Sequence, residues 1–318
     1  MKVPFPANLN LQKKLISPMG KHILITGGTG LVGKHLTSLL LEKGYTVSHL
    51  SRKTGNNPKV KTFLWDVAKG SIDADCIIGV DLIVHLAGAG VADKRWTDGR
   101  KREIISSRTK SIALIYNLLK QHPHQIKKVV SASATGFYGD CGNELVTETS
   151  VPAKDFLGQC CVAWEKAVDE GAALGLEILK LRTGVVLTDE GGALKQLALP
   201  IKFGFGTILG SGKQWVPWIH LQDAIDLYVF GIEKELTGVY NMVAPNPATN
   251  AKLTITVAKQ LNRPLWLPKV PAFALKLALG EMSAVVLAST KVSAAKTEQA
   301  GFVFKYPTIK EAIREIYA

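Results

Sequence analysis

The stretch ITGGTGLVGKHL, residues 25–36, decides the fold because it places three glycines at a fixed spacing between two predicted elements. Gly27, Gly30 and Gly33 form GxxGxxG after the apolar run 22–26 and before a helical pattern. Glycine is needed where a chain turns tightly, brings its backbone against a pyrophosphate and packs a helix close to a strand. The helix start then offers free N–H groups to phosphates. The stretch therefore predicts a strand, a phosphate-binding turn and a helix, as in dinucleotide-binding proteins.

Short apolar runs alternate with helical patterns from residue 21 onward, which is typical of parallel strands joined by crossover helices. The first helix is expected to end at Gly44. The predicted strands are HILIT (22–26), YTVSHLS (45–51), VKTFLWD (60–66), DLIVHLA (81–87), KKVVSAS (127–133) and LEILKLRTGVVL (176–187). This order predicts an α/β fold with a Rossmann-type doubly wound parallel sheet.

The second half of the chain indicates a smaller lobe, mixed and mostly helical, that faces the substrate. We expect the Rossmann domain over residues 20–190 and the substrate lobe over 191–318, with helices dominating from about residue 249. GVYNMVA (238–244) is predicted to return to the sheet as a strand. Residues 1–19 lack the apolar run of a signal peptide and are expected to form a flexible arm. Met19 is an alternative start.

The choice of dinucleotide is predicted by the end of the second strand, where a carboxylate would hold the ribose 2′-hydroxyl of NAD. This chain has Ser51, Arg52 and Lys53 there. A guanidinium can donate two hydrogen bonds to a 2′-phosphate, so we predict that the cofactor is NADP(H). The alternative is that these residues form only a solvated basic turn. Asp66 ends the third strand, where its carboxylate can reach the adenine amino group or serve as an ordinary strand-end aspartate.

The net charge is +13 and is concentrated in residues 1–150, which hold 21 Lys/Arg against 11 Asp/Glu. Such an excess suits nucleic acid, an anionic membrane or a polyphosphate ligand. The basic residues are scattered and no RNA-binding aromatic signature occurs, so we expect no nucleic-acid partner. The apolar stretch 273–289 is interrupted by Lys276, Gly280 and Glu281, which argues against a membrane span.

Four cysteines form no CxxC and have no histidine at zinc-ligand spacing, so no metal site is expected. A reducing cytoplasm fits this cysteine usage best. Cys160 and Cys161 are expected to be core residues rather than nucleophiles.

Four motifs carry a family resemblance: GGTGLVG (27–33), VHLAG (84–88), SASATGFYG (131–139) and PWIHLQD (217–223). Together these motifs make the chain resemble an extended short-chain dehydrogenase/reductase. The stretch AGAGVADKRWTDGRKREIISSRTKS (87–111) and the segments from residue 248 to the C-terminus are similar to an atypical subgroup. Its members are called epimerase family proteins, or nucleoside-diphosphate-sugar epimerases, and have a C-terminal domain of unknown function. The likeness spans residues 21–318.

The motif and the resemblance together imply a set of NADP contacts from the turn, the ends of three strands and one helix. That set is Gly27, Gly28, Thr29, Gly30, Leu31, Val32, Gly33, Ser51, Arg52, Leu86, Ala87, Gly88, Glu103, Arg108 and Val186. Helical periodicity independently places Arg108 on the buried side of its helix, where it needs an anionic or carbonyl partner because an unpaired buried charge is costly. A cofactor phosphate is one candidate partner; the alternative is a side chain that snorkels out to solvent.

The acid expected of this superfamily is missing. A hydroxyl residue after the fifth strand and a YxxxK on the next helix normally orient the substrate and transfer the proton. Ser133 and Thr135 fit the orienting role, or else cap the strand end. The helix DFLGQCCVAWEKA (155–167), however, has Leu157 and Cys161 at the tyrosine and lysine positions.

Three interpretations of the missing acid stay open. Tyr138 in the adjoining loop supplies the proton, although a tyrosine there is usually structural. A substrate group or water carries it while the protein only positions the hydride. Or the protein binds NADP(H) without turnover, as a sensor or regulatory module.

The remaining conspicuous side chains favour structural roles or stay ambiguous. His85 is predicted beside the cofactor or as a satisfied polar group in the sheet, and His220 at the start of the Asp223 helix. Aromatic residues could line a pocket between the lobes or pack in the core: Trp96, Phe203, Phe205, Trp215 and Trp218.

The sequence thus predicts a cytoplasmic NADP(H)-binding oxidoreductase or epimerase, acting as a monomer or homodimer on an unidentified carbonyl or sugar-nucleotide substrate. The alternative is a non-catalytic NADPH-binding protein.

Overall fold

The computed structural model describes residues 20–318, so the predicted arm at 1–19 lies outside the described residues. An eight-stranded sheet forms the larger part, in the order β12-β8-β6-β5-β1-β2-β3-β4, and is parallel except for β4. The predicted α/β class with a doubly wound sheet is confirmed. The strands of this sheet are β1 (His22–Thr26), β2 (Thr46–Ser51), β3 (Lys61–Asp66), β4 (Ser71–Ile72), β5 (Leu82–His85), β6 (Lys128–Ala134), β8 (Glu177–Thr183) and β12 (Gly238–Met242).

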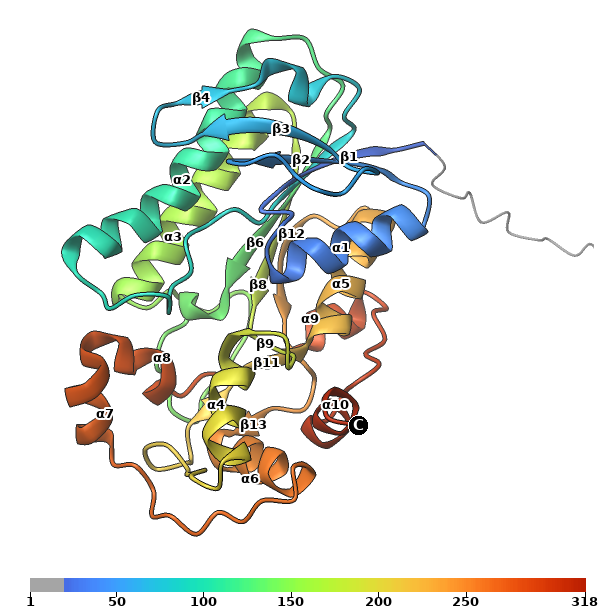
Figure 1. Ribbon diagram of the computed structural model, residues 1–318. Helices are drawn as coiled ribbons and strands as arrows, with labels where there is room; N and C mark the ends of the chain where they lie inside the picture. Colours follow the sequence, from blue (N-terminus) through green and yellow to red (C-terminus); the bar gives the residue numbers. More distant parts are fainter. Residues whose placement is uncertain (1–19) are drawn as a thin grey trace, which may run out of the picture.

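Helices cover both faces of the sheet (Figure 1). Side chains of successive strand residues point to opposite faces, and β1 shows the result: Ile23 and Ile25 pack on one side and Leu24 on the other. Helices α1 (Leu31–Glu42) and α5 (Leu221–Glu233) cover the first side. Helices α2 (Asp98–Gln121) and α3 (Phe156–Asp169) cover the second. The sheet is therefore buried on both faces, as its near-continuous apolar strands require.

One predicted strand is wrong in its extent. The run 176–187 is broken at Gly184 into β8 and β9 (Val185–Leu187). β9 leaves the main sheet and pairs with β11 (Trp218–His220). A Cβ at Gly184 would lie 2.8 Å from the Pro217 carbonyl oxygen, so this crossing needs glycine. The run 238–244 does return to the sheet, as β12 paired with β8.

A separate cluster of elements from the second half of the chain packs around Trp218, which is 1% exposed, and we call it the second lobe. Its core is shared by α4 (Gly192–Lys202), α6 (Asn250–Gln260) and α10 (Ile309–Ile316). The other elements of the chain are short: η1 (Ala74–Ile77), η2 (Thr135–Phe137), β7 (Leu145–Val146), η3 (Glu170–Leu174), β10 (Trp215–Val216), β13 (Ala248–Thr249), α7 (Ala272–Leu279), η4 (Gly280–Ser283), α8 (Ala284–Leu287), β14 (Lys291–Val292) and α9 (Ala295–Gln299).

Two properties of residues 20–318 bear on the function classes. None of their helices combines the length and the apolar character needed to cross a bilayer. They also contain no cluster of three or more histidine, cysteine or acidic side chains that could bind a metal ion.

Candidate functional site

The glycine turn joins β1 to α1 at the point where the strand order of the sheet reverses. Gly27 has φ +71°, and a Cβ there would meet the Leu86 carbonyl carbon at 3.0 Å. A Cβ on Gly33 would lie 2.3 Å from the Gly27 carbonyl oxygen. The first position therefore needs glycine for its backbone angle, and the second for the approach of helix to strand.

The end of β5 is fixed against this turn. The Thr26 hydroxyl accepts hydrogen bonds from the backbone N–H groups of Leu86 and Ala87, both at 3.1 Å. Gly30 is the N-cap of α1, and its N–H donates to the Gly27 carbonyl oxygen at 3.0 Å. The N–H groups of the first helical turn have no acceptor within the helix and carry the positive end of its dipole. A crevice at such a reversal of strand order, with a helix N-terminus in it, can hold a pyrophosphate.

The basic turn after β2 lies beside the start of α2. Ser51 ends β2, and Arg52 is exposed in the following turn. A hydrogen bond from Arg100, at 2.7 Å, holds the pKa of Glu103 below its ordinary value, with smaller contributions from the charges of Lys94 and Arg52. Two of the predicted contacts, Arg52 and Glu103, thus come from different elements and share one electrostatic neighbourhood.

Asp66 stands at the end of β3 and closes the turn that follows. Its Oδ1 accepts hydrogen bonds from the backbone N–H groups of Ala68 and Lys69, at 3.0 and 3.1 Å. The structure therefore shows the role of an ordinary strand-end aspartate, and its contact with adenine stays a prediction.

Arg108 lies on the buried side of α2, as predicted, and is 9% exposed. Its Nη1 donates to the carbonyl oxygens of Ile104 at 2.8 Å and Ala89 at 3.0 Å, and its guanidinium stacks over Trp164. Burial lowers the pKa of Arg108. Carbonyl oxygens, one of the two kinds of partner expected, therefore bind Arg108, and the alternative of a solvent-reaching side chain is wrong. Its contact with a cofactor phosphate stays a prediction. A Cβ on Gly88 would lie 3.1 Å from the Arg108 Cζ, so these two predicted contacts adjoin each other.

The positions of the missing tyrosine and lysine lie where α3 packs on the turn after β6. A Cβ at Gly136 would lie 3.3 Å from the Leu157 Cβ. Cys161 is 4% exposed, its Sγ lies 3.7 Å from the Ala134 carbonyl oxygen, and burial raises its pKa to about 12. Cys160 is also buried, and burial raises its pKa as well. Both cysteines are core residues, as predicted, and neither forms a thiolate readily at neutral pH.

A buried ion pair occupies the adjoining space. Arg182 of β8 forms a forked pair with Glu165 of α3, at 2.8 and 2.9 Å. The Ser133 hydroxyl donates to the same carboxylate at 2.7 Å. Arg182 also donates to the Tyr138 hydroxyl at 3.0 Å, and that hydroxyl donates to the Asn241 side chain at 2.6 Å. We refer to these five side chains as the Glu165 network.

The network determines what the predicted hydroxyls can do. Tyr138 is 3% exposed, and burial raises its pKa despite the nearby Arg182. Its geometry matches the structural alternative for a tyrosine in this turn, and its role as an acid stays a prediction. Ser133 is committed to Glu165, whereas Thr135 forms only a long bond of 3.4 Å to the Thr183 carbonyl oxygen. Thr135 is therefore the less constrained of the two predicted orienting hydroxyls.

Sequence reasoning missed the pairing of Glu165 with Arg182. Glu165 lies within the helical pattern 155–167, and Arg182 lies within an apolar strand pattern. An arginine inside a predicted buried strand was the available signal, because such a charge requires a partner.

The two conspicuous histidines are structural. His85 is completely buried in β5, with Ser111 Oγ at 2.8 Å and Ser131 Oγ at 3.3 Å from its ring nitrogens. Burial and the charge of Arg108 lower its pKa to about 3. His220 is the N-cap of α5, as predicted, and its Nδ1 accepts from the Gln222 N–H at 3.1 Å.

The aromatic side chains do not form one pocket, so that interpretation is wrong. Trp218 is buried in the core of the second lobe, while Phe203 and Phe205 are 71% and 62% exposed. Trp96 packs edge-on against Phe156, and Trp215 donates to Asn143. These aromatic residues pack against different neighbours or lie exposed in a loop. The sequence could group them only by residue type.

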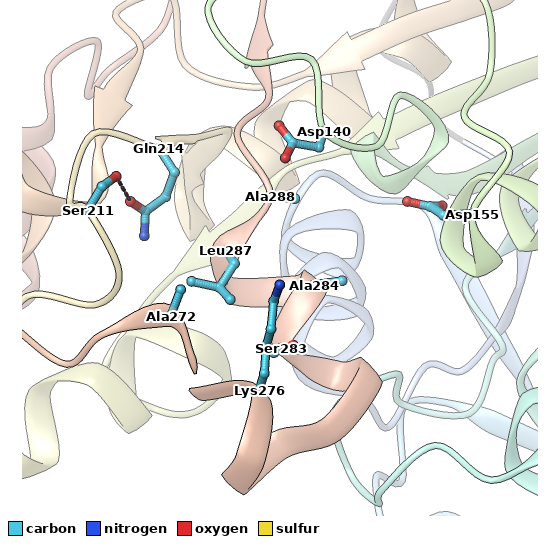
Figure 2. A pocket seen from close by; sticks show the side chains of 10 residues that line it. All are labelled: Asp140, Asp155, Ser211, Gln214, Ala272, Lys276, Ser283, Ala284, Leu287 and Ala288. Atoms are coloured by element: carbon cyan, nitrogen blue, oxygen red, sulfur yellow. Dashed lines mark hydrogen bonds between the residues drawn. The ribbon is translucent and has the colours of Figure 1, made fainter. Parts of the chain in front are cut away.

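A cavity of about 410 Å³ lies instead between the two lobes. One wall contains Asp140, from the loop after η2, and Asp155, the N-cap of α3. The opposite wall contains Lys276 of α7 and residues of α8, and Figure 2 shows the charged ends turned toward the space between the walls. No sequence motif marks these residues as a site. Asp155 stands two residues before the tyrosine position, which brings this cavity to the start of the helix that carries it.

Comparison with known proteins shows the family of the chain. Residues 23–167 match the NAD dependent epimerase/dehydratase family, and residues 270–316 match a domain of unknown function, DUF1731. The epimerase family protein YfhF of Bacillus subtilis is 34% identical over 93% of this chain and 98% of its own length.

Two solved structures are similar over nearly the whole chain. Human epimerase family protein SDR39U1, crystallised with NADPH, is 30% identical, with a TM-score of 0.81 over 93% of this chain and 99% of that one. A nucleoside-diphosphate sugar epimerase from Corynebacterium glutamicum is 33% identical, with a TM-score of 0.75 over 93% of this chain and 58% of that one. The resemblance stated from the motifs is thereby confirmed. The chain belongs to the epimerase family proteins, within the NAD(P)-dependent epimerase/dehydratase superfamily, and carries the DUF1731 domain at its C-terminal end.

Proposed function

We propose that the protein binds NADP(H) and acts as an oxidoreductase or epimerase on a small-molecule carbonyl or hydroxyl substrate. The observation that carries the cofactor choice is the end of β2, where Arg52 is exposed and Ser51 to Lys53 contain no carboxylate. A guanidinium there favours a 2′-phosphate, whereas NAD is favoured by a carboxylate. The human relative crystallised with NADPH supports the same choice.

The residues present fit this cofactor. The turn from Gly27 to Gly33 would hold the pyrophosphate against the N-terminus of α1, and Arg52 would hold the 2′-phosphate. Leu86 to Gly88 and Val186 would lie along the remainder of the cofactor. Glu103 and Arg108 would contact it from α2. When bound, the nicotinamide supplies a hydride donor or acceptor. The chain supplies binding and orientation, and the second lobe encloses the substrate cavity beside it.

Proton transfer has to proceed without the usual tyrosine and lysine. General acid/base catalysis contributes about a hundredfold to ten-thousandfold, so its loss slows a hydride transfer without removing the geometry for it. Among the predicted hydroxyls, Thr135 is the one we assign to substrate orientation, because Ser133 and Tyr138 are both bound within the Glu165 network. Water in the cavity then carries the proton.

A second candidate function is a non-catalytic NADPH-responsive protein. The observation that favours it is the apolar filling of the catalytic position by Leu157 and the buried Cys161. Purified protein, NADPH and a panel of carbonyl compounds separate the two functions. Loss of nicotinamide absorbance with at least one substrate supports the enzyme, and tight NADPH binding without any oxidation supports the sensor.

The cofactor assignment is tested by titration with NADPH and NADH, followed by nicotinamide fluorescence. We expect NADPH to bind about tenfold to a hundredfold more tightly, because hydrogen bonds to charged groups are the strong ones. Arg52→Ala should remove most of that preference. Lys120→Ala, at an exposed lysine in the last turn of α2, is the control and should keep it. Equal binding of the two cofactors by the unaltered protein would contradict the assignment.

A further inference from the structure

The cavity between the lobes has a charge pattern that restricts its ligand. Three charged side chains are turned toward it from separate elements: Asp140, Asp155 and Lys276 (Figure 2). Its other lining residues are small, apolar or neutral polar, including Ser211 and Gln214. The walls therefore combine two carboxylates with one ammonium group.

Both carboxylates are oriented by backbone hydrogen bonds through one oxygen each. Asp140 Oδ1 accepts from the N–H groups of Gly142 and Ser289, both at 3.2 Å. Asp155 Oδ1 accepts from the Gly158 N–H at 2.8 Å. Among the described residues, no protein group donates a hydrogen bond to the second oxygen of either carboxylate. Ionised carboxylates only accept hydrogen bonds, so this wall recognises donors such as hydroxyl or amino groups.

The opposite wall is held rigid by Gln214, which is 6% exposed. Its Nε2 donates to the carbonyl oxygens of Leu209 at 2.9 Å and Val286 at 3.3 Å, which ties the loop before β10 to α8. Lys276 projects from α7 on this same side, as a compact charge on a flexible stem. One ammonium group suits one anionic group of a ligand.

The groups that recognise a nucleoside diphosphate are missing from this space. Among residues 20–318, those lining the cavity include no arginine and no aromatic side chain. The adjoining hollow adds Asn143 and a second ammonium group, that of Lys213, and again no arginine or aromatic side chain. A diphosphate is recognised best by forked guanidinium groups, and a nucleobase by stacking on an aromatic ring.

We propose that the substrate is a small hydroxylated or aminated molecule with a single anionic group, held by Lys276, and that it is not a nucleoside-diphosphate sugar. Asp140 and Asp155 accept hydrogen bonds from its hydroxyl or amino groups. This inference rests on the proposed function in one respect, namely that the cavity is the substrate site. It departs from the sugar-nucleotide alternative raised by the sequence.

The test uses the full-length protein with saturating NADP⁺ and measures binding by calorimetry. The probes are gluconate, glucose 6-phosphate, glucose and UDP-glucose, so the first two distinguish a carboxylate from a monophosphate. We expect either gluconate or glucose 6-phosphate, each of which has a single anionic group, to bind more tightly than both glucose and UDP-glucose. Lys276→Met should weaken that binding about tenfold or more, while Lys276→Arg should retain it, because a charge-assisted contact is lost only in the first. Lys252→Met, at an exposed lysine of α6, is the control.

Tighter binding of UDP-glucose, no binding of any probe, or unchanged binding in Lys276→Met would each overturn the inference. NADPH titration of the same samples separates its failure from that of the proposed function. Lys276-dependent binding of gluconate or glucose 6-phosphate without NADPH binding would refute the proposed function and leave the cavity assignment intact. NADPH binding together with preferred binding of UDP-glucose would support the proposed function and refute the inference about the substrate.

Discussion

The glycine turn follows β1, whereas the Glu165 network joins β6, β8 and β12, with β5 between the two regions. The two regions differ in which features of a dinucleotide-dependent enzyme are present. At the turn, Gly27 and Gly33 retain the backbone angle and the close contact that a dinucleotide site needs. At α3, Leu157 and Cys161 replace the reactive pair, and a buried ion pair of Glu165 and Arg182 fills the space beside them.

Cofactor binding and acid/base chemistry depend on different features of this fold. The turn acts through backbone N–H groups and steric room, which depend on a few glycines and on strand order. Acid/base chemistry depends on one or two exposed side chains with suitable pKa values. A chain can lose the second while the first remains, and the protein then becomes slower or turns into a binding module.

The largest effect is expected from breaking the Glu165 network. Glu165→Ala leaves the Arg182 guanidinium buried with only part of its hydrogen bonds, so we expect a loss of about 3–5 kcal/mol in the free energy of unfolding. Glu233→Ala, which removes an exposed pair with Lys43, is the control and should cost under about 1 kcal/mol. Urea unfolding measures both. A cost for Glu165→Ala no greater than that of the control would show that the pair is not structural.

A substitution in the glycine turn should reduce NADPH affinity more than it reduces the stability of the fold. Gly33→Ala places a methyl group 2.3 Å from the Gly27 carbonyl oxygen, which costs about 1–3 kcal/mol through strain and moves the N-terminus of α1. We expect NADPH affinity to fall with it. Gly99→Ala in the first turn of α2 is the matched control, because its Cβ would meet nothing closer than 3.9 Å. Unaltered NADPH binding by Gly33→Ala would contradict the role given to the turn.

His85, between the two regions in β5, should make stability depend on pH. Its pKa of about 3 in the folded protein lies below the ordinary value of a histidine, so the unfolded chain binds the extra proton first as the pH falls. Stability is therefore present above the unfolded pKa and is lost toward the folded pKa, by about 1.4 kcal/mol per pH unit below about 6.5.

His85→Gln removes this titration, so its free energy of unfolding should fall less between pH 6 and pH 4 than that of the unaltered protein. His122→Gln, at an exposed histidine just after α2, should leave the dependence unchanged. Urea unfolding across this range checks both. Parallel pH profiles for His85→Gln and the unaltered protein would contradict the assignment.

The smallest effect is expected from refilling the tyrosine position alone. Leu157→Tyr adds a hydroxyl without the lysine that would lower its pKa, since Cys161 stays in place. We expect no gain in NADPH oxidation over Leu157→Phe, which adds the same ring without the hydroxyl. A rise of more than tenfold in Leu157→Tyr alone would show that the site lacks only the acid.

Most of the sheet could be predicted, because buried parallel strands are continuous apolar runs and glycine turns have a fixed spacing. The strand at 176–187 failed because its break at Gly184 depends on Pro217, which is distant in sequence. The burial of Arg108 was predictable from helical periodicity, and its carbonyl partners followed from the cost of an unpaired charge. The grouping of aromatic residues into one pocket failed because residue type carries no information on proximity.

By itself, the sequence determined the doubly wound sheet, the glycine turn, the basic end of the second strand and the loss of the tyrosine and lysine. These are local features, set by backbone angles, period and residue type within a few positions. Only the tertiary structure decided that Ser133 and Tyr138 belong to a buried ion pair, and that Asp140, Asp155 and Lys276 face one cavity. Those groupings join segments far apart along the chain, so they exist only once strands, helices and lobes have packed.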